Sequence, residues 1–157
     1  MTVEIERKFL LSDIPGAEAL GAGEALRQGY LADEDDVSVR IRIAARNSIL
    51  TVKGGKGVSR TEVELLLSGD QVDALWPHTK GRRVEKTRYR VPLAGAKERV
   101  AEVDVYSGDL SGLCTVEVEF RSEAEAAEFE PPAWFGRDVT DEPGWSNSAL
   151  ARNGVPR

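Results

Sequence analysis

The chain has 157 residues, of which 31% are charged and 6% aromatic, with a formal net charge of −6 and a pI near 5.0. This length fits a single domain spanning 1–157, and the acidic balance argues against a nucleic-acid partner. Because no apolar run approaches roughly 18 residues and no charged-then-apolar leader opens the chain, we expect a cytoplasmic protein without a membrane partner.

Short strands separated by turns dominate the chain. Strands are predicted over residues 2–11, 25–32, 37–46, 48–54, 59–67, 82–92, 98–106 and 113–121. Helices are predicted over 68–77, 122–130 and 146–153, the first two from Ser68 with Gln71 and Ser122 with Glu125 at capping-box spacing. Eight strands with short connections indicate a mainly β (α+β) fold, either an antiparallel meander or a closed barrel.

Charged residues alternate along these strands, so that each set projects from one face. The acidic pairs are Glu4 and Glu6, Glu62 and Glu64, Glu102 and Asp104, and Glu117 and Glu119. The basic sets are Arg40 and Arg42, Lys53 beside Thr51, and Lys86, Arg88 and Arg90. Lys8, on the first acidic strand, is the main exception to this sorting.

The single cysteine and single histidine restrict the possible chemistry. Cys114 lies in a strand-like run and is expected to be a buried small hydrophobe, whereas His78 follows Pro77 at a predicted helix end. A multi-cysteine zinc site and a histidine-based triad are therefore excluded. Any chemistry must come from carboxylates, Lys, Arg and hydroxyl groups.

An antiparallel sheet with one face in water also alternates apolar and polar residues, and each strand taken alone fits that structural explanation. Two observations on the whole set favour an enclosed site. A solvated face usually mixes charges of both signs with uncharged polar residues. In addition, like charges at alternate positions lie only about 7 Å apart, a mild repulsion that a purely structural sheet has no reason to repeat on four strands.

Closure of the strands into a barrel would bring the charged faces together in the interior. We therefore expect an eight-stranded antiparallel β-barrel that forms a charged tunnel, with a few flanking helices. Carboxylates without His or Cys favour Mg²⁺ or Mn²⁺ over zinc, and Arg and Lys bind phosphate oxygens. The acidic net charge is no obstacle, because bound metal ions reverse the local sign.

The segment Glu4-Ile5-Glu6-Arg7-Lys8 resembles the ExExK signature of the CYTH superfamily, the triphosphate tunnel metalloenzymes. The motifs that follow it are more specific in their order and cover nearly the whole chain. They are Leu26-Arg27-Gln28-Gly29-Tyr30-Leu31, Arg40-x-Arg42, Thr51-Val52-Lys53, Arg60-x-Glu62-x-Glu64, Glu85-Lys86-Thr87-Arg88-Tyr89, Glu102-x-Asp104 and Glu117-x-Glu119. Residues 81–89 and 132–136 are most similar to the short bacterial members that hydrolyse inorganic tripolyphosphate.

This resemblance implies one or two Mg²⁺ or Mn²⁺ ions and a small-molecule triphosphate, most directly inorganic tripolyphosphate cleaved to pyrophosphate and phosphate. The implied metal ligands are Glu4, Glu6, Glu117 and Glu119, with Glu62, Glu64 and Asp104 in or next to the coordination shell. The implied phosphate contacts are Lys8, Arg40, Arg42, Lys53, Lys86 and Arg88. The catalytic group would comprise Tyr30, Lys86, Glu4 and Glu117. Tyr30 either orients substrate or water or is a wall residue, and the proton carrier is either Lys86 or a metal-bound hydroxide.

Related proteins often have a Lys before the Asn of the C-terminal segment, where this chain has Ser146 before Asn147. That cation is missing from the expected phosphate site. Two other functions stay open. An adenylate cyclase, or a nucleoside or thiamine triphosphatase, on the same scaffold would need a pocket for the organic group. A non-catalytic polyphosphate-binding module would not need the acidic pairs. Monomer and homodimer are both compatible with the sequence.

Overall fold

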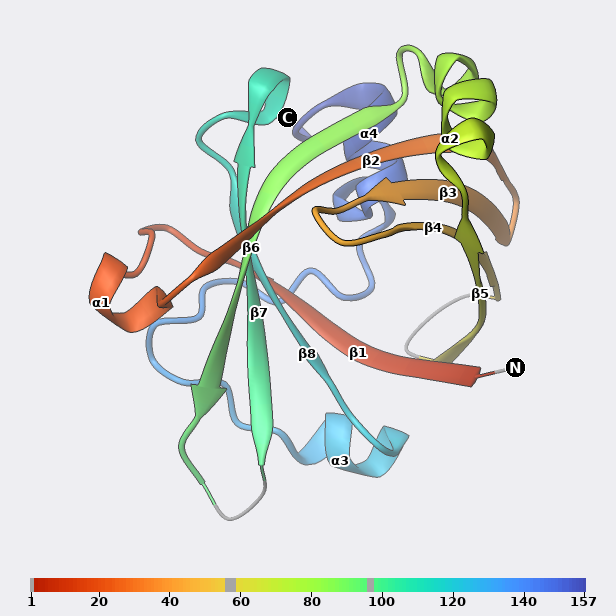
Figure 1. Ribbon diagram of the computed structural model, residues 1–157. Helices are drawn as coiled ribbons and strands as arrows, with labels where there is room; N and C mark the ends of the chain where they lie inside the picture. Colours follow the sequence, from red (N-terminus) through yellow and green to blue (C-terminus); the bar gives the residue numbers. More distant parts are fainter. Residues whose placement is uncertain (1, 56–58, 96–97) are drawn as a thin grey trace.

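Eight antiparallel strands close into a barrel in the computed structural model, which describes residues 2–55, 59–95 and 98–157 (Figure 1). The strands are β1 (Thr2–Leu10), β2 (Gly23–Glu34), β3 (Val37–Ile43), β4 (Ser48–Gly54), β5 (Ser59–Leu67), β6 (Arg83–Leu93), β7 (Arg99–Ser107) and β8 (Cys114–Glu119). Their order around the ring is β1-β5-β4-β3-β2-β6-β7-β8. The prediction of a mainly β fold with an eight-stranded antiparallel ring is confirmed.

Helices are few and short, as the sequence predicts. They are α1 (Ala17–Leu20), α2 (Gly69–Leu75), α3 (Glu123–Glu128) and α4 (Asn147–Asn153), with 3₁₀ turns η1 (Trp76–Thr79), η2 (Gly108–Leu110) and η3 (Pro143–Trp145). Ser68 and Gln71 form the predicted capping box at α2. The sequence did not predict α1 and the 3₁₀ turns, because each is only one turn long. Within the described part of the chain, no helix is both long enough and apolar enough to cross a membrane.

The pairing register places the charged face of each strand on the inside of the ring. Glu4 lies opposite Arg60, and Glu117 lies between Lys8 on one side and Glu102 on the other. Because side chains alternate along a strand, the apolar residues between these positions face outwards. The barrel is therefore inverted relative to small barrels that fill their interior with apolar side chains.

The main hydrophobic core lies outside the ring. The outward faces of β1, β7 and β8 pack against the segment that follows β8, and Cys114 is buried there as expected. Phe9 stacks at 4.9 Å between ring centroids against Phe135, and Phe129 and Phe120 extend this aromatic cluster. Burial of these rings stabilises one wall of the barrel without using its interior.

The chain after α3 runs back along β1 and fixes the position of the C-terminal segment. The amide of Gly136 donates to the carbonyl of Leu10 at 2.8 Å, and the amide of Val139 donates to the carbonyl of Lys8 at 2.8 Å. A Cβ atom at Gly136 would lie 2.4 Å from the Leu10 carbonyl oxygen, so only glycine permits this approach. This pairing leads the chain to one end of the barrel.

A second hydrophobic cluster closes that end of the barrel. Its buried members are Val84, Tyr106, Leu110, Val139, Trp145 and Leu150. Val84 and Tyr106 come from the inner face of the ring, whereas Trp145 and Leu150 come from η3 and α4. The interior is thus charged along most of its length and apolar at this end, which we call the closed end.

Arg7 ties β1 to the C-terminal segment, and its replacement tests that connection. Its guanidinium donates to the carbonyls of Ala126 (2.9 Å) and Phe129 (3.0 Å) and to the Asp138 carboxylate (2.8 Å). We expect Arg7→Met to lower the free energy of unfolding by about 1–3 kcal/mol, because buried carbonyls lose their donor. Urea denaturation measures this, with Arg121→Met at an exposed position as the control. An equal decrease in the free energy of unfolding in both variants would contradict the role of Arg7 in joining β1 to the C-terminal segment.

Asp138 makes the same connection sensitive to pH. Partial burial alone would raise the pKa of Asp138, but hydrogen bonds from Thr140 and Arg7 outweigh it and lower the pKa. A lowered carboxyl pKa contributes stability above the unfolded value of about 3.9, and this contribution is lost as the pH falls through the folded value. The melting temperature of Asp138→Asn should therefore lie below that of the wild type at pH 7, and the gap should shrink below about pH 4. A gap independent of pH would refute this explanation.

Candidate functional site

The ring order sorts the inward charges into two continuous halves. Strands β7, β8, β1 and β5 are neighbours, and so are β4, β3, β2 and β6. The first group, here the acidic half, carries Glu102, Asp104, Glu117, Glu119, Glu4, Glu6, Glu62 and Glu64. The second, here the basic half, carries Lys53, Arg40, Arg42, Lys86, Arg88 and Arg90. Among the described residues, Lys8 and Arg60 are cations within the acidic half, and Glu24, opposite Arg88, is a carboxylate within the basic half.

The two halves neutralise each other where they meet at β5 and β4. Lys53 Nζ lies 2.8 Å from Glu4 Oε2 and 4.0 Å from Glu62 Oε2. Within the acidic half, Arg60 Nη2 lies 3.2 Å from Glu6 Oε1. The pairs of Lys53 thus join a residue predicted for phosphate to residues predicted for the metal, whereas Arg60 is not among the residues predicted to bind either ligand.

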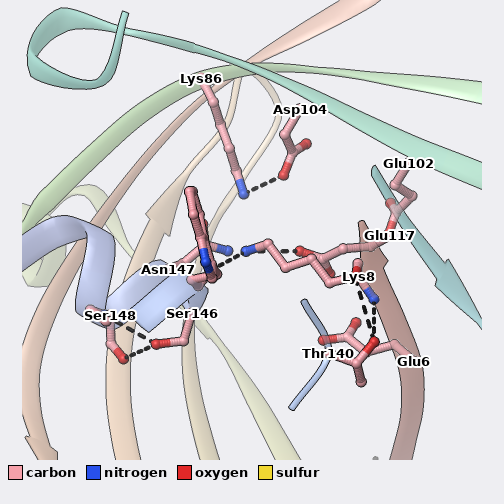
Figure 2. Close-up of polar contacts among 12 residues, drawn as sticks. Glu6, Lys8, Lys86, Glu102, Asp104, Glu117, Thr140, Ser146, Asn147 and Ser148 are labelled. Carbon is pink, nitrogen blue, oxygen red and sulfur yellow. Dashed lines mark hydrogen bonds and ion pairs between the residues drawn. The ribbon is translucent and has the colours of Figure 1, made fainter. Parts of the chain in front are cut away.

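The other junction, between β6 and β7, is a buried cluster of three charges. Lys86 Nζ donates to Asp104 at 2.6 Å (Figure 2). Arg88 donates to both oxygens of Asp104, at 2.8 and 2.9 Å. Burial opposes ionisation of Asp104, but the two cations outweigh it and lower its pKa, whereas burial lowers the pKa of Lys86 to about 8. Asp104 therefore contacts cationic side chains on both oxygens.

The carboxylates of β1 and β8 are crowded. Burial, followed by the neighbouring carboxylate of Glu117, raises the pKa of Glu6 well above its ordinary value. Glu117 itself keeps a lowered pKa, because Lys8 at 3.7 Å and Arg88 outweigh the effect of burial. Burial and the charge of Glu4 also raise the pKa of Glu119. This end of the acidic half holds more negative charge than its cations neutralise.

This crowding is what a divalent cation would relieve. Among residues 2–55, 59–95 and 98–157, no three acidic, His or Cys side chains are close enough to hold a metal ion in the present arrangement. The carboxylates instead contact Lys and Arg. The donors are all oxygen atoms and two of the carboxyl groups have raised pKa values, so the residues fit a hard cation once the ion pairs separate.

The basic half contains polar groups without partners. Arg40 Nε and Thr51 Oγ1 are buried and make no hydrogen bond within the described residues, and neither does either amide atom of Gln28. Tyr30, buried on the same face as Gln28, lies opposite Arg40 in the pairing of β2 with β3. Although burial alone would lower the pKa of Arg40, the hydroxyl of Tyr30 raises it. Burial and the like charges of Arg40 and Arg88 lower the pKa of Arg42. Crowded cations and unpaired donors fit an anion.

The C-terminal segment contacts the charged interior at the closed end. Lys8 Nζ donates to the carbonyl of Trp145 at 2.6 Å, and the hydroxyl of Tyr106 donates to Asn147 Oδ1 at 2.6 Å (Figure 2). Ser146 caps α4 by accepting from the amide of Ala149. The residue that replaces the expected Lys thus starts the helix. Sequence reasoning did not assign Tyr106 a place in the site, although it continues the alternation of Glu102 and Asp104.

Two predicted residues lie at the rim of the ring. Glu64 and Glu119 are on the inward faces of β5 and β8, but both are solvent-exposed. A surface cavity of about 780 Å³ lies outside the ring between residues 12–19, the end of β6 and residues 130–136. It contains none of the predicted site residues, so the candidate site is the charged interior.

Comparison with known proteins agrees with this geometry. The chain is 45% identical over 149 residues to the inorganic triphosphatase of Nitrosomonas europaea, covering 94% of this chain and 96% of that protein. It is 36% identical to the inorganic triphosphatase of Acetivibrio thermocellus, covering 98% and 96%. The crystal structure of the inorganic triphosphatase NE1496 superposes with a TM-score of 0.70 at 41% identity, covering 98% and 100%. The family model of the CYTH domain matches residues 2–139, and the chain belongs to this family.

Proposed function

We propose that this protein is a divalent-metal-dependent triphosphatase that hydrolyses inorganic tripolyphosphate to pyrophosphate and phosphate inside the barrel. The observation that carries the proposal is the division of the interior into an acidic and a basic half. One half suits a hard cation and the other suits a polyanion beside it. The names of the two bacterial relatives support the same activity.

The acidic half would hold the metal. The proposed ligands are Glu4, Glu6, Glu117 and Glu119, with Glu62 and Glu64 beside them on β5. Oxygen-only donors favour Mg²⁺ or Mn²⁺. When bound, such an ion neutralises phosphate charge and lowers the pKa of coordinated water. Asp104, expected from the resemblance near the metal, is better placed to hold Lys86 and Arg88 in position, because both its oxygens contact these cations.

The basic half would bind the triphosphate. Its proposed contacts are Arg40, Arg42, Lys53, Lys86 and Arg88, joined by Lys8 from β1. Guanidinium and ammonium groups bind phosphate oxygens and stabilise charge on the transferred phosphoryl group. Two roles are open for Tyr30. Either it orients the substrate or a water molecule, or it is a structural residue of the barrel wall.

Binding would exchange partners inside the barrel. Lys53 now pairs with Glu4, and Lys8 lies near Glu117. Carboxylates that held a metal ion would no longer pair with the ammonium groups, which would then be available to bind phosphate, and a bound triphosphate would have the converse effect. Binding of either ligand would therefore break ion pairs that the other ligand would otherwise have to break, so each ligand increases the affinity for the other.

Replacing a proposed metal ligand should abolish turnover. We expect Glu4→Gln and Glu117→Gln each to lower phosphate release from tripolyphosphate by at least about 100-fold in the presence of Mg²⁺ or Mn²⁺. Glu123→Gln, on exposed α3, should retain wild-type activity. Released phosphate is measured at saturating metal. Similar losses in all three variants would argue against the acidic half as the metal site.

The substrate class is tested on the same wild-type protein. Tripolyphosphate should be the preferred substrate over pyrophosphate, ATP and thiamine triphosphate, because most of the described inward positions between β1 and β8 supply charged groups that suit phosphate. Formation of cyclic AMP from ATP would instead support the cyclase alternative. Binding of metal and anion without turnover of any substrate would support the non-catalytic module.

Calorimetry tests the exchange of partners. A non-hydrolysable imido analogue of tripolyphosphate should bind at least about tenfold more tightly with saturating Mg²⁺ than without it, within the usual range of coupling energies. The variant Lys53→Met should show weaker coupling, because Glu4 then has no ammonium to release. Coupling unchanged in Lys53→Met would refute this part of the proposal.

A further inference from the structure

Gln28 is a buried amide with no partner. Its side chain is fully buried on the inner face of β2, and neither Oε1 nor Nε2 makes a hydrogen bond within the described residues. The other glutamine of the chain, Gln71, is satisfied in the capping box of α2. The contrast shows that the lack of partners is a property of the position of Gln28.

A buried amide without hydrogen-bond partners lowers the stability of the fold unless a ligand or a water molecule forms hydrogen bonds with it. Burying an amide without hydrogen bonds destabilises a folded protein, because the group loses its hydrogen bonds to water and gains none in return. Nearly all buried polar groups in native proteins have a partner. Violations of this kind concentrate at functional sites, where the partner is a ligand or an ordered water.

The position of Gln28 in the ring relates it to the reaction site. It lies opposite Arg42 on β3 and opposite Val84 on β6. Val84 belongs to the hydrophobic cluster of the closed end, and Lys86 is the next inward residue of β6. Gln28 therefore lies in the basic half, next to the end that η3 and α4 cover.

We infer that Gln28 binds and orients the attacking water; this inference rests on the proposed function. Attacking and leaving oxygens are roughly in line in phosphoryl transfer. A triphosphate whose terminal phosphoryl group faces the closed end has its leaving group on the opposite side, so the attacking water lies between that phosphorus and the closed end. Gln28 is there, and its amide accepts a hydrogen bond from the water through Oε1 and donates to a phosphoryl oxygen through Nε2.

The reaction itself leaves Gln28 unchanged. The water oxygen forms a bond to the terminal phosphorus while the bond from that phosphorus to the bridging oxygen breaks. One water proton stays on the released orthophosphate, and the other passes to the pyrophosphate leaving group. A side-chain amide does not ionise near neutral pH, so Gln28 orients the attacking water and takes no proton from it.

The test is Gln28→Met, which keeps the length of the side chain and removes both hydrogen-bonding atoms. We expect kcat for tripolyphosphate to fall by about 100-fold, the lower end of the loss when one pre-organised hydrogen-bonding group is removed. The Kd of the imido analogue with Mg²⁺ should rise by less than about tenfold, because Nε2 is one of several proposed donors to the phosphate oxygens, whereas the lost contact to the water affects only turnover. The melting temperature should stay equal or rise, because an unsatisfied buried amide is gone.

Two matched variants separate this role from packing. Leu26→Met alters the neighbouring buried position on the same face of β2 and should keep kcat within threefold of the wild type. Gln71→Met removes the capping-box amide, and it should lower the melting temperature without affecting kcat.

Several results would overturn the inference. They are a kcat of Gln28→Met within threefold of the wild type, an equal loss in Leu26→Met, a parallel weakening of analogue binding, or a melting temperature lowered by more than about 5 °C, which would make the amide structural. Failure of the wild type to hydrolyse tripolyphosphate with metal would instead refute the proposed function, and the inference with it.

Discussion

The closure of the ring by β1 is the constraint on which the remaining structure depends. β1 pairs with β5 on one side and with β8 on the other, and these two pairings join β5 to the neighbouring strands β7 and β8 in one acidic half. An open sheet would expose the charged faces to water, where screening weakens their interactions.

The apolar side chains that would fill an ordinary barrel lie outside, where Phe9, Phe129 and Phe135 build a core with the segment after β8. The main hydrophobic core therefore lies outside the barrel, and most of the interior is lined by charged side chains.

In the absence of ligands, many charged groups of the interior are paired with one another. Replacing a buried ion pair by apolar residues is often neutral or stabilising, so pairs such as Lys86 with Asp104 do not explain the stability of the barrel. Their arrangement is better understood as preorganisation. Cations and carboxylates are held a few ångströms apart, so that exchange of partners needs side-chain movement and no change of the fold. The raised pKa of Glu6, caused by burial and then by Glu117, marks the place where this balance is incomplete.

Much of this architecture could be predicted from the sequence, since alternation along a strand depends only on local geometry. The inward faces and the number of strands follow from it. The order of strands around the ring does not, because the acidic strands are the first, fifth, seventh and eighth in the chain and become neighbours only through long-range pairing. The same limit applies to the closed end. The residues next to Tyr106 in the sequence do not indicate that its hydroxyl donates a hydrogen bond to Asn147. Those next to Gln28 do not indicate that its amide makes no hydrogen bond within the described residues.

The pairing of β1 also has a kinetic consequence. Of the eight strands of the ring, β1 comes first in the chain and can pair with β8 only when residues 114–119 are available, so the barrel is rich in contacts between residues distant in sequence. Proteins with high contact order fold slowly, in milliseconds to seconds, because loop-closure entropy is lost before those contacts form. Until then the unpaired edges of β1 and β5 can pair with other chains. For this molecule, aggregation of the nascent chain is a hazard of the same connectivity that encloses its charges.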